Sequence, residues 1–507
     1  MEISNFFQGE LIPDDVLLAG YSYLVHKYDV KTYVIMPSCI SKKHIRGNII
    51  HKNGWSIYDK RYWPGDTDIE HLVFALKHEN FDLLSLKRLL EILQISDMES
   101  YIKSRPTGIY ARKIWFLFEW FQERQLNIPD CTKCKIIDLL DDNKYFVAKG
   151  IFHKRYNLKN NLLGTRSFSP IIRRTPNLEK FIQLNLKEKA ASLIGNVSKN
   201  LVARAASFLL LSDSKASFEI EGERAPVSRI ERWGKTVSQA GKFPLTRNEI
   251  IRLQNILIKD KRFTQIGLRK DGVFLGERDN DGYPLPEFIG ARPEDLEMLI
   301  DAIIDTNNNL NCTQLDPVLQ AVAIAFGFVY IHPLEDGNGR IHRYLIHHIL
   351  SERKFSPPGL HFPVSSSMLK HIERYRDTLR HHSLPLMDLI EWKNTENMNV
   401  KVLNRTSDLY SYFDCTEACE FIYSCVKETI DIDFPEELNY LIGYDQAIET
   451  ISNLLDMPDN TIKQLIVFIR QNNWKLSKRR RDKEFVELSD NEVIQIEKIV
   501  YEAFNLL

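Results

Sequence analysis

The chain has 507 residues, and its 67 Lys and Arg residues offset 68 Asp and Glu residues to give a formal net charge of −1. This balance excludes a protein that is basic overall, although it is compatible with a local basic patch. The length favours roughly two to four domains. A hydrophobic content of 44% supplies enough apolar side chains for well-packed cores.

The sequence contains few features that indicate a cellular compartment or contact with a membrane. The N-terminus lacks the basic start and apolar centre of a secretion signal, and no apolar run is long enough to span a membrane. Seven cysteines, an odd and modest number, are typical of reduced thiols in a cytoplasm. Cys131 and Cys134 form a single C-x-x-C pair without a second pair nearby, which favours two free thiols over a zinc or redox site. We therefore expect a cytoplasmic protein with no membrane contact.

Residues 1–176 are expected to form an N-terminal α(+β) region, whose role the sequence does not reveal. Helical periodicity marks four segments, residues 14–28, 72–78, 83–93 and 110–121. The last segment is aromatic on more than one face, which favours burial in a core. β-Branched residues between 32 and 50 favour strands. The first helical segment is compatible with a small helix-turn-helix-like module.

Residues 177–403 are expected to form a helical core that carries most of the functional signals. Thr246 followed by Glu249 is typical of a capping box and predicts a helix over residues 250–258. Glycine-bounded stretches between residues 267 and 276 predict a hairpin. Its short apolar centre consists of Val273, Phe274 and Leu275.

Two helices are predicted around a glycine-rich turn. Asp316 before a proline is a good helix start, and the almost wholly apolar run that follows predicts a buried helix ending at His332. Residues 340–350 predict a second helix, so Gly337-Asn338-Gly339 lies at its N-terminus. The N–H groups and dipole of a helix N-terminus attract anions, and glycine lets a backbone approach a phosphate closely.

The side chains around this turn match the needs of polyphosphate chemistry. Arg340 and Arg343 lie three residues apart, so one helix face can present both to phosphate oxygens. Asp336 is suited to a divalent cation that bridges phosphates. His332 is the natural general base. The set predicts nucleotide chemistry, whereas each residue alone would more often be structural.

Residues 332–343 resemble the signature of Fic-domain enzymes, His-Pro-Phe-x-Asp/Glu-Gly-Asn-Gly-Arg-x-x-Arg. The resemblance implies transfer of a nucleoside monophosphate, usually AMP from ATP, to a protein hydroxyl. His332 would then deprotonate the target Ser, Thr or Tyr, and Asp336 would hold Mg²⁺ between the α- and β-phosphates. The remaining signature residues would bind the nucleotide phosphates, with Arg343 at the γ-phosphate and the others beside it: Gly337, Asn338, Gly339 and Arg340.

Two positions of the signature carry further information. Leu334 stands where the family has Phe, and its apolar side chain is expected to pack inward. Doc, a phosphate-transferring relative, has Lys in place of Asn338, so the asparagine favours nucleotidyl transfer over phosphorylation. The resemblance covers roughly residues 184–365.

Two other segments resemble parts of Fic proteins. Ser217, Glu221 and Gly222 fit the Ser/Thr-x-x-x-Glu-Gly/Asn motif of the family's inhibitory helix, expected here at about 212–222. The resemblance implies that Glu221 forms a salt bridge with Arg343. The carboxylate of Glu221 would then repel the γ-phosphate and block productive ATP binding. The hairpin at 267–276 resembles the flap that pairs with the target segment, so Val273 to Leu275 would clamp the target.

Residues 404–507 are expected to form a C-terminal helical region, winged-helix or helix-turn-helix-like in type. Helical patterns occur at 408–430 and 461–470, and Ser489 with Glu492 predicts a capping box before a final helix. Lys475–Lys483 is expected to be a basic loop. Such a loop could touch DNA phosphates, but a solvated charged surface or a docking site for an acidic partner is at least as compatible with it.

These observations predict a mainly α-helical protein with a Fic-type core and a β-hairpin flap, flanked by an α(+β) region and a helical region. The expected activity is that of an autoinhibited protein adenylyltransferase, which uses ATP and Mg²⁺ and releases pyrophosphate. Self-modification and a homodimer are further expectations that the resemblance allows. Two alternatives stay open: removal of AMP at the same site, with Glu221 positioning a water, and a DNA-binding regulator with a nucleotide-sensing core.

Overall fold

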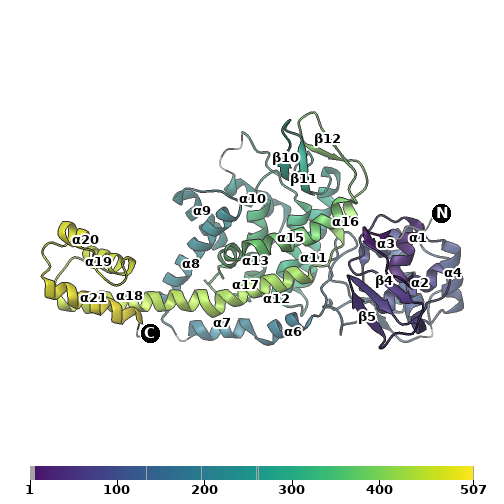
Figure 1. Ribbon diagram of the computed structural model, residues 1–507, viewed down its shortest axis with the longest axis horizontal. Helices are drawn as coiled ribbons and strands as arrows, with labels where there is room; N and C mark the ends of the chain where they lie inside the picture. Colours follow the sequence, from purple (N-terminus) through teal and green to yellow (C-terminus); the bar gives the residue numbers. More distant parts are fainter. Residues whose placement is uncertain (1–5, 133, 196, 259, 261, 506–507) are drawn as a thin grey trace. The chain divides into compact units, whose positions relative to one another are not determined.

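The computed structural model describes residues 6–132, 134–195, 197–258, 260 and 262–505 (Figure 1). Because 55% of the chain is helical and the sheets are small, the predicted mainly α fold is confirmed. The chain divides into two compact units. Unit 1 comprises Met1–Ile182, Ala240–Arg353 and His371–Tyr423, and unit 2 comprises Gln183–Gln239, Lys354–Lys370 and Ser424–Leu507. No helix in the described ranges combines the length and hydropathy needed to cross a bilayer.

The N-terminal part of unit 1 combines small sheets with helices. Within the described residues, one sheet has the order β3-β4-β6-β5 and another has the order β7-β9-β8. The strands are β1 (Phe6–Phe7), β2 (Glu10–Leu11), β3 (Val16–Leu18), β4 (Ser38–Ser41), β5 (Ile49–Lys52), β6 (Trp55–Tyr58), β7 (Ile137–Asp138), β8 (Ile151–His153) and β9 (Leu158–Asn160). The helices are α1 (Gly20–Tyr28), α2 (Asp68–His78), α3 (Leu83–Ile92), α4 (Ile95–Ser104) and α5 (Ile109–Gln122).

Residues 14–28 do not form the single helix that their periodicity suggested. Val16–Leu18 is instead strand β3, which pairs antiparallel with β4, and only Gly20–Tyr28 is helical. The helix-turn-helix-like interpretation of this segment is therefore wrong. The apolar side chains at its start are used by the sheet, a long-range pairing that local periodicity does not report.

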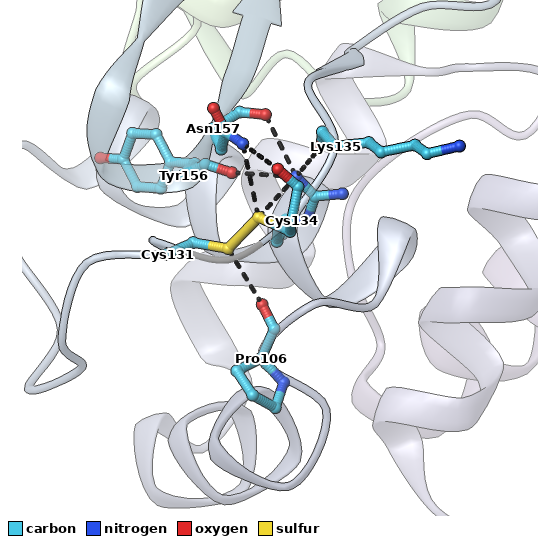
Figure 2. Close-up of a disulfide and its surroundings, with 7 residues drawn as sticks. Pro106, Cys131, Cys134, Lys135, Tyr156 and Asn157 are labelled. Carbon is cyan, nitrogen blue, oxygen red and sulfur yellow. Dashed lines mark hydrogen bonds between the residues drawn. A yellow bond between two sulfur atoms is a disulfide. The ribbon is translucent and has the colours of Figure 1, made fainter.

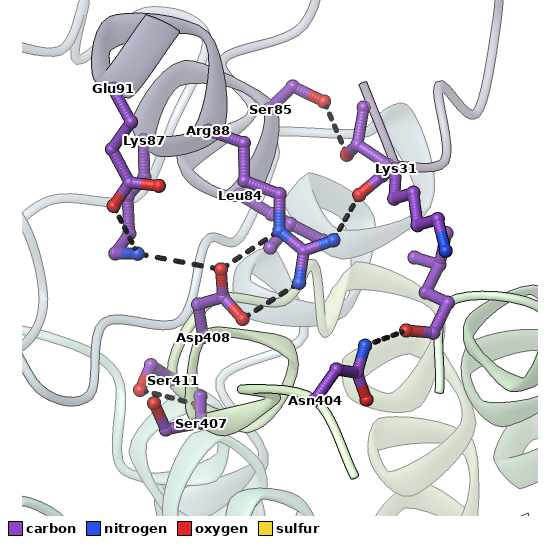
Figure 3. Close-up of polar contacts among 12 residues, drawn as sticks. Lys31, Leu84, Ser85, Lys87, Arg88, Glu91, Asn404, Ser407, Asp408 and Ser411 are labelled. Carbon is purple, nitrogen blue, oxygen red and sulfur yellow. Dashed lines mark hydrogen bonds and ion pairs between the residues drawn. The ribbon is translucent and has the colours of Figure 1, made fainter. Parts of the chain in front are cut away.

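An ion-pair network fixes helix α3 to α16 (Ser407–Ser411) inside unit 1 (Figure 3). Arg88 donates from Nε and Nη2 to the two carboxylate oxygens of Asp408, both at 2.9 Å. Lys87 adds a longer contact to the same carboxylate at 3.5 Å. Burial of Asp408 would raise its pKa, but these cations hold the pKa below its usual value. The network joins segments that lie 320 residues apart in the sequence.

The C-x-x-C pair is closed by a disulfide between Cys131 and Cys134, so the prediction of two free thiols is wrong (Figure 2). The backbone N–H of Cys131 donates to the carbonyl of Arg155 at 2.9 Å. The side chain of Asn157 donates to the carbonyl of Cys134 at 2.5 Å. These contacts hold both cysteines against one segment of unit 1, an arrangement that the spacing of the motif alone could not reveal.

The helical core of unit 1 is built around α12 (Pro317–Ile331), which is buried from Val318 to Ile331. Asp316 caps its start by accepting the N–H of Val318 at 2.8 Å, as predicted. Helix α12 packs against α11 (Leu296–Asn311) and α13 (Asn338–Glu352) (Figure 1). The remaining elements of this core are α10 (Arg247–Leu257), β10 (Phe274–Arg278), β11 (Pro284–Ile289), α15 (Ile372–Met387), β12 (Trp392–Asn394) and β13 (Val400–Val402).

Unit 2 is helical in the part of the chain that the structure describes. Its helices are α7 (Leu186–Gly195), α8 (Lys199–Ile220), α9 (Val227–Val237), α14 (Val364–Lys370), α18 (Phe434–Leu454), α19 (Asp459–Gln471), α20 (Lys478–Glu484) and α21 (Asp490–Asn505). Helices α6 (Pro176–Gln183) and α17 (Thr416–Glu428) each cross a boundary between the units. Helix α8 packs against α9, α14 and α18, while α18, α19 and α21 share a second hydrophobic core.

The basic segment near the C-terminus is not a loop, because residues 478–484 form helix α20. Ser477 caps this helix, and three of the six basic side chains of residues 475–483 pair with acidic residues of unit 2. Arg480 pairs with Glu484, and Lys475 pairs with Glu497 at 2.7 Å. These ion pairs offset about half of the positive charge that phosphate binding would use, and contact with DNA stays a prediction.

Candidate active site

His332 lies at the C-terminal end of α12 in a left-handed conformation, with φ 53° and ψ 59°. This conformation costs a non-glycine residue about 1 kcal/mol or more, so surrounding contacts must hold it. The imidazole is nearly buried, at 9% exposure, and its Nδ1 lies 3.2 Å from the carbonyl oxygen of Val329. A proton on Nδ1 donates to this carbonyl, which leaves Nε2 as the basic nitrogen. The geometry therefore prepares His332 to accept a proton.

Arg269 is the residue that fixes this end of α12. Its buried guanidinium donates to the carbonyl oxygens of His332 at 2.8 Å, Asp271 at 2.6 Å and Ala291. Burial lowers the pKa of Arg269 to about 10, so the side chain keeps its charge at neutral pH. Sequence analysis missed Arg269, because a lone arginine in a glycine-bounded stretch gives no signal of the three carbonyls that it meets.

The signature loop between α12 and α13 is closed from within by Asn338. Its Oδ1 accepts the backbone N–H of Leu334 at 3.0 Å, and its Nδ2 donates to the carbonyl of the same residue at 2.8 Å. Leu334 is fully buried, as its apolar character predicted. The Asn338 side chain thus shapes the loop from within, while contact of the Gly337–Gly339 backbone with phosphate stays a prediction.

The loop ends in the N-terminus of α13, which begins at Asn338 after Gly337. Gly337 has φ 98°, a conformation that favours glycine. Gln254 braces the loop from α10, since its amide donates to the carbonyl of Asp336 at 3.3 Å and accepts the N–H of Gly267 at 2.8 Å. Gln254 is fully buried and was also missed in the sequence. The loop is therefore a rigid turn at a positive helix end.

The charged signature residues lie on this turn and on the first turns of α13. Asp336 is half exposed at 49%, and its Oδ1 lies 2.6 Å from Nη2 of Arg340. Arg340 and Arg343 are both buried. No group of three or more His, Cys, Asp or Glu in the described residues could hold a metal unaided. A single accessible carboxylate fits Mg²⁺, which usually takes one or two protein carboxylates and completes its shell with phosphates and water.

The predicted hairpin, called the flap below, is present with other boundaries, while its role in docking a target stays a prediction. Strands β10 and β11 pair antiparallel from Phe274 with Ile289 to Arg278 with Pro284, and the register shifts between Leu275 and Gly276. The hairpin thus covers residues 274–289. Residues 267–269 do not belong to it, because Leu268 forms a bridge with Leu334 of the signature loop. Of the glycines that bound the predicted hairpin, Gly267 lies in the loop before strand β10, and Gly276 lies at the bulge within that strand.

The three predicted docking residues are placed differently from one another. Val273 precedes the flap, and its carbonyl accepts the N–H of Gly290 at 3.0 Å. Phe274 opens strand β10, and Leu275 is 52% exposed on the same strand. A Cβ on Gly290 would lie 2.6 Å from Val273 Cγ1 and 3.1 Å from the Cβ of His332. This glycine, which sequence analysis did not single out, allows the end of the flap to approach the imidazole.

A cavity of about 220 Å³ lies beside the imidazole of His332. The flap contributes Glu287 and Phe288, and the ring of Phe288 lies 5.6 Å from that of His332. Helix α15 contributes Arg376 and Arg380 on the other side. The volume can admit a single side chain, so the cavity offers a place where a target residue could meet the basic nitrogen of His332.

A second hairpin supports the flap, and the sequence did not predict it. Strands β12 and β13 pair antiparallel, and the turn between them contacts the flap. Arg278 donates to the carbonyl of Met398 at 2.6 Å, and Asn399 donates to the carbonyl of Gly272 at 2.8 Å. Both ends of strand β10 are thereby anchored, which favours a defined position for its exposed middle.

The predicted inhibitory motif belongs to unit 2. Helix α8 begins at Lys199, well before the expected start near 212, and Glu221 is its C-terminal cap. Ser217 is buried in the last turns of the helix, and Gly222 has φ 71°, typical of the residue after a helix end. The local helical form fits the motif, while the pairing of Glu221 with Arg343 stays a prediction.

Comparison with known proteins identifies the region around this site. A model of the Fic/DOC family matches residues 244–350. The protein adenylyltransferase Fic of Nematostella vectensis is 28% identical over 163 residues, which are 32% of this chain and 30% of that protein. The match thus spans less than a third of the relative's length.

Two solved structures of Fic proteins are also similar in part. The first is a Fic domain containing signaling protein from Bacteroides thetaiotaomicron, 18% identical over 52% of this chain and 97% of that chain, with a TM-score of 0.35. The second is a Fic family protein from Desulfovibrio desulfuricans, 16% identical over 65% of this chain and 86% of that chain, with a TM-score of 0.37.

Proposed function

Because the chain contains a Fic domain of the Fic/DOC family at residues 244–350, we propose that it is a protein adenylyltransferase that transfers AMP from ATP to a protein hydroxyl. One observation carries the proposal. His332 lines a cavity of about 220 Å³, its Nδ1 faces the carbonyl of Val329 so that Nε2 is the basic nitrogen, and the signature loop leads from His332 into the N-terminus of α13. A hydroxyl in the cavity and a phosphate at the helix end would both be within the reach of this site.

The reaction follows from these placements. A Ser, Thr or Tyr hydroxyl of the target donates its proton to Nε2 of His332, and its oxygen attacks the α-phosphorus of ATP. The bond from the α-phosphorus to the oxygen that bridges the α- and β-phosphates breaks, and pyrophosphate leaves. The N–H groups of the signature loop and the guanidinium of Arg340 offset the charge on the phosphates. Arg343 would hold the γ-phosphate.

Mg²⁺ would be held by Asp336 together with the phosphates, and when bound it supplies positive charge to the leaving pyrophosphate. The flap would hold the target backbone by strand pairing along β10, the strand on which Leu275 is exposed. Strand β10 is anchored near both ends by the turn between β12 and β13, so the target would meet a strand edge in a defined position.

The proposal includes autoinhibition by Glu221. Support comes from the motif Ser217 to Gly222 and from the helical form of that segment, with Glu221 at the end of α8. A carboxylate paired with Arg343 would satisfy the guanidinium and repel the γ-phosphate. Removing that carboxylate should raise activity by roughly ten-fold or more, the factor that corresponds to 1.4 kcal/mol.

The test is label transfer from ATP that carries its tracer in the α-phosphate, with cell lysate as the source of target. We expect labelled protein to increase in the Glu221→Gly variant. Adding His332→Ala to that variant should lower the label by about 10²–10⁴-fold, the usual contribution of a general base. His381→Ala is the matched control, because His381 is an exposed histidine of unit 1 that pairs with Glu417.

Other outcomes would contradict the proposal. Transfer that survives His332→Ala, or falls equally in His381→Ala, would remove the role of the fixed imidazole. If no variant labels protein while ATP still binds, adenylyl transfer is wrong. Release of AMP from premodified target by the wild type would then identify removal of AMP as the activity.

A further inference from the structure

The disulfide between Cys131 and Cys134 belongs to the N-terminal part of unit 1, and the proposed transfer of AMP does not use it (Figure 2). Both cysteines are partly exposed, so a reagent in solution can approach them. Redox-active pairs share the C-x-x-C spacing, and the surroundings of each sulfur decide its reactivity. The contacts of the two sulfur atoms therefore show which chemistry this pair favours.

The Sγ atom of Cys134 lies among hydrogen-bond donors. Nη1 of Arg112, on helix α5, is 3.3 Å from this sulfur, and Nδ2 of Asn157 is 3.6 Å from it. A disulfide sulfur is a weak acceptor and gains little from two donors, whereas a thiolate carries a full negative charge. The environment of Cys134 therefore favours the charged, reduced form of its sulfur.

The positive charge of Arg112 is available to this sulfur. The side chain is buried, and burial lowers its pKa, but a guanidinium keeps its proton in proteins. Nη1 also donates to three backbone carbonyl oxygens at 2.8–3.4 Å. These carbonyl groups fix the position of the guanidinium without neutralising its charge, and no carboxylate among the described residues forms an ion pair with it.

The other charged side chains of this segment do not compete for the sulfur. Arg155 pairs with Glu119 at 2.9 Å and with Asp130 at 2.8 Å, so these three charges are engaged with one another. The side chain of Lys135 points away from the disulfide (Figure 2). Arg112 is thus the cation that acts on Cys134.

The Sγ atom of Cys131 meets an acceptor instead. It lies 3.6 Å from the carbonyl oxygen of Pro106, at an exposed position. After reduction, a neutral thiol can donate its proton to this carbonyl, whereas the carbonyl would repel a thiolate. Pro106 and Asn157 lie on opposite sides of the disulfide (Figure 2). The two sulfurs are therefore prepared for different protonation states.

We propose that this disulfide is a thiol–disulfide exchange site, which an external dithiol reduces by attack on Cys131 and which leaves Cys134 as a thiolate beside Arg112. The attacking thiolate forms a bond to Sγ of Cys131, the bond between the two cysteine sulfurs breaks, and its electron pair stays on Sγ of Cys134. The second thiolate of the reductant then attacks the mixed disulfide and releases Cys131, which takes up a proton from water. The dithiol is oxidised to its own disulfide, and the protein gains two electrons and one proton.

The asymmetry of the two sulfurs sets the direction of attack. Exchange is faster when the leaving sulfur forms the more stable thiolate, and Arg112 stabilises the thiolate at Cys134. Attack on Cys134 would instead expel Cys131 as a thiolate beside the carbonyl of Pro106. The exchange does not depend on the proposed transfer of AMP, so its tests need no assay of that activity.

The first test is the pH dependence of alkylation by iodoacetamide, measured by peptide mass spectrometry on the full chain after reduction with dithiothreitol and removal of the reductant. We expect the midpoint for Cys134 to lie below about pH 7.5, against about pH 8.5 for an ordinary thiol. Cys312, an exposed free cysteine of the same chain, supplies a reference profile. A midpoint for Cys134 equal to that of Cys312 would overturn the proposal.

Substitutions test the role of the cation. Arg112→Met should raise the midpoint for Cys134 by at least one pH unit, while Arg112→Lys keeps a positive charge and should retain most of the effect. Arg105→Met is the matched control, because Arg105 stacks over the ring of Tyr101 at 4.7 Å. Urea unfolding shows whether each variant is folded, and the profile of the unaltered chain decides the matter if Arg112→Met is not. Equal midpoints with and without Arg112 in folded protein, or as large a shift in Arg105→Met, would refute the role of this cation.

The direction of attack is tested with glutathione, a monothiol that leaves its adduct on the sulfur that it attacks. After a brief reaction with the oxidised chain and an acid quench, we expect at least ten times more adduct on Cys131 than on Cys134. An adduct mainly on Cys134 contradicts the proposed direction. Failure of the reduced pair to close in excess oxidised glutathione would overturn the exchange site itself.

Discussion

Replacing Arg269 by Lys tests the idea that this buried side chain holds the general base in place. The guanidinium donates to three carbonyl oxygens, those of His332, Asp271 and Ala291. A lysine has a single nitrogen and cannot reach all three from one position. About two buried carbonyls would then lack a donor.

The magnitude follows from these lost bonds. An unsatisfied buried acceptor costs about 1–3 kcal/mol, so the loss of two donors in Arg269→Lys should lower the free energy of unfolding by about 2–6 kcal/mol. The left-handed conformation of His332 also loses its main restraint. If half of that energy, about 1–3 kcal/mol, is lost in the transition state, kcat should fall by about five-fold to 160-fold.

The assay is label transfer in the Glu221→Gly background, together with urea unfolding. We expect kcat to fall while the KM for ATP changes little, because Arg269 acts through His332 and not on the nucleotide. Arg292→Lys is the control, since Arg292 pairs with the carboxylate of Asp295, which a lysine can also reach. An Arg269→Lys variant with the kcat and unfolding midpoint of its parent would refute the reasoning.

Three further predictions concern other parts of unit 1. Gly290→Ala should lower the free energy of unfolding by about 1–3 kcal/mol and reduce AMP transfer, because the new Cβ would clash with Val273. A Cβ at Gly195 would meet nothing within 4 Å, so Gly195→Ala should change neither urea unfolding nor label transfer. Burial raises the pKa of Glu79 from 4.5 to about 7, so its charged form destabilises the fold increasingly from about pH 4.5 to above pH 7. Glu79→Gln should therefore raise the thermal midpoint at pH 8 and lose that advantage at pH 5; an equal gain at both values would show that ionisation is not the cause. Arg88→Met should cost about 3 kcal/mol in urea unfolding at pH 7, because Asp408 stays buried without its bidentate partner, and unchanged stability would contradict the ion pair as an anchor of α16.

The sequence by itself determined the elements whose signals are local. Asp316 before a proline marked the start of α12, and the apolar run that follows predicted its burial. Gly337 marked the turn before α13. These signals lie within a few residues of the structure that they specify, so the helix pair and the glycine-rich turn between its helices could be predicted before the fold was known.

The tertiary structure decided what depends on residues that are distant in the sequence. Contacts across the fold bring Arg269 to the three carbonyl oxygens that it binds. Such contacts also bring Gly290 close to His332 and place the second hairpin against the flap. Local patterns also misplaced the flap, and they missed helix α20 and the disulfide of Cys131 with Cys134. Periodicity and spacing report which face of a segment is apolar, but they do not report which other segment covers it.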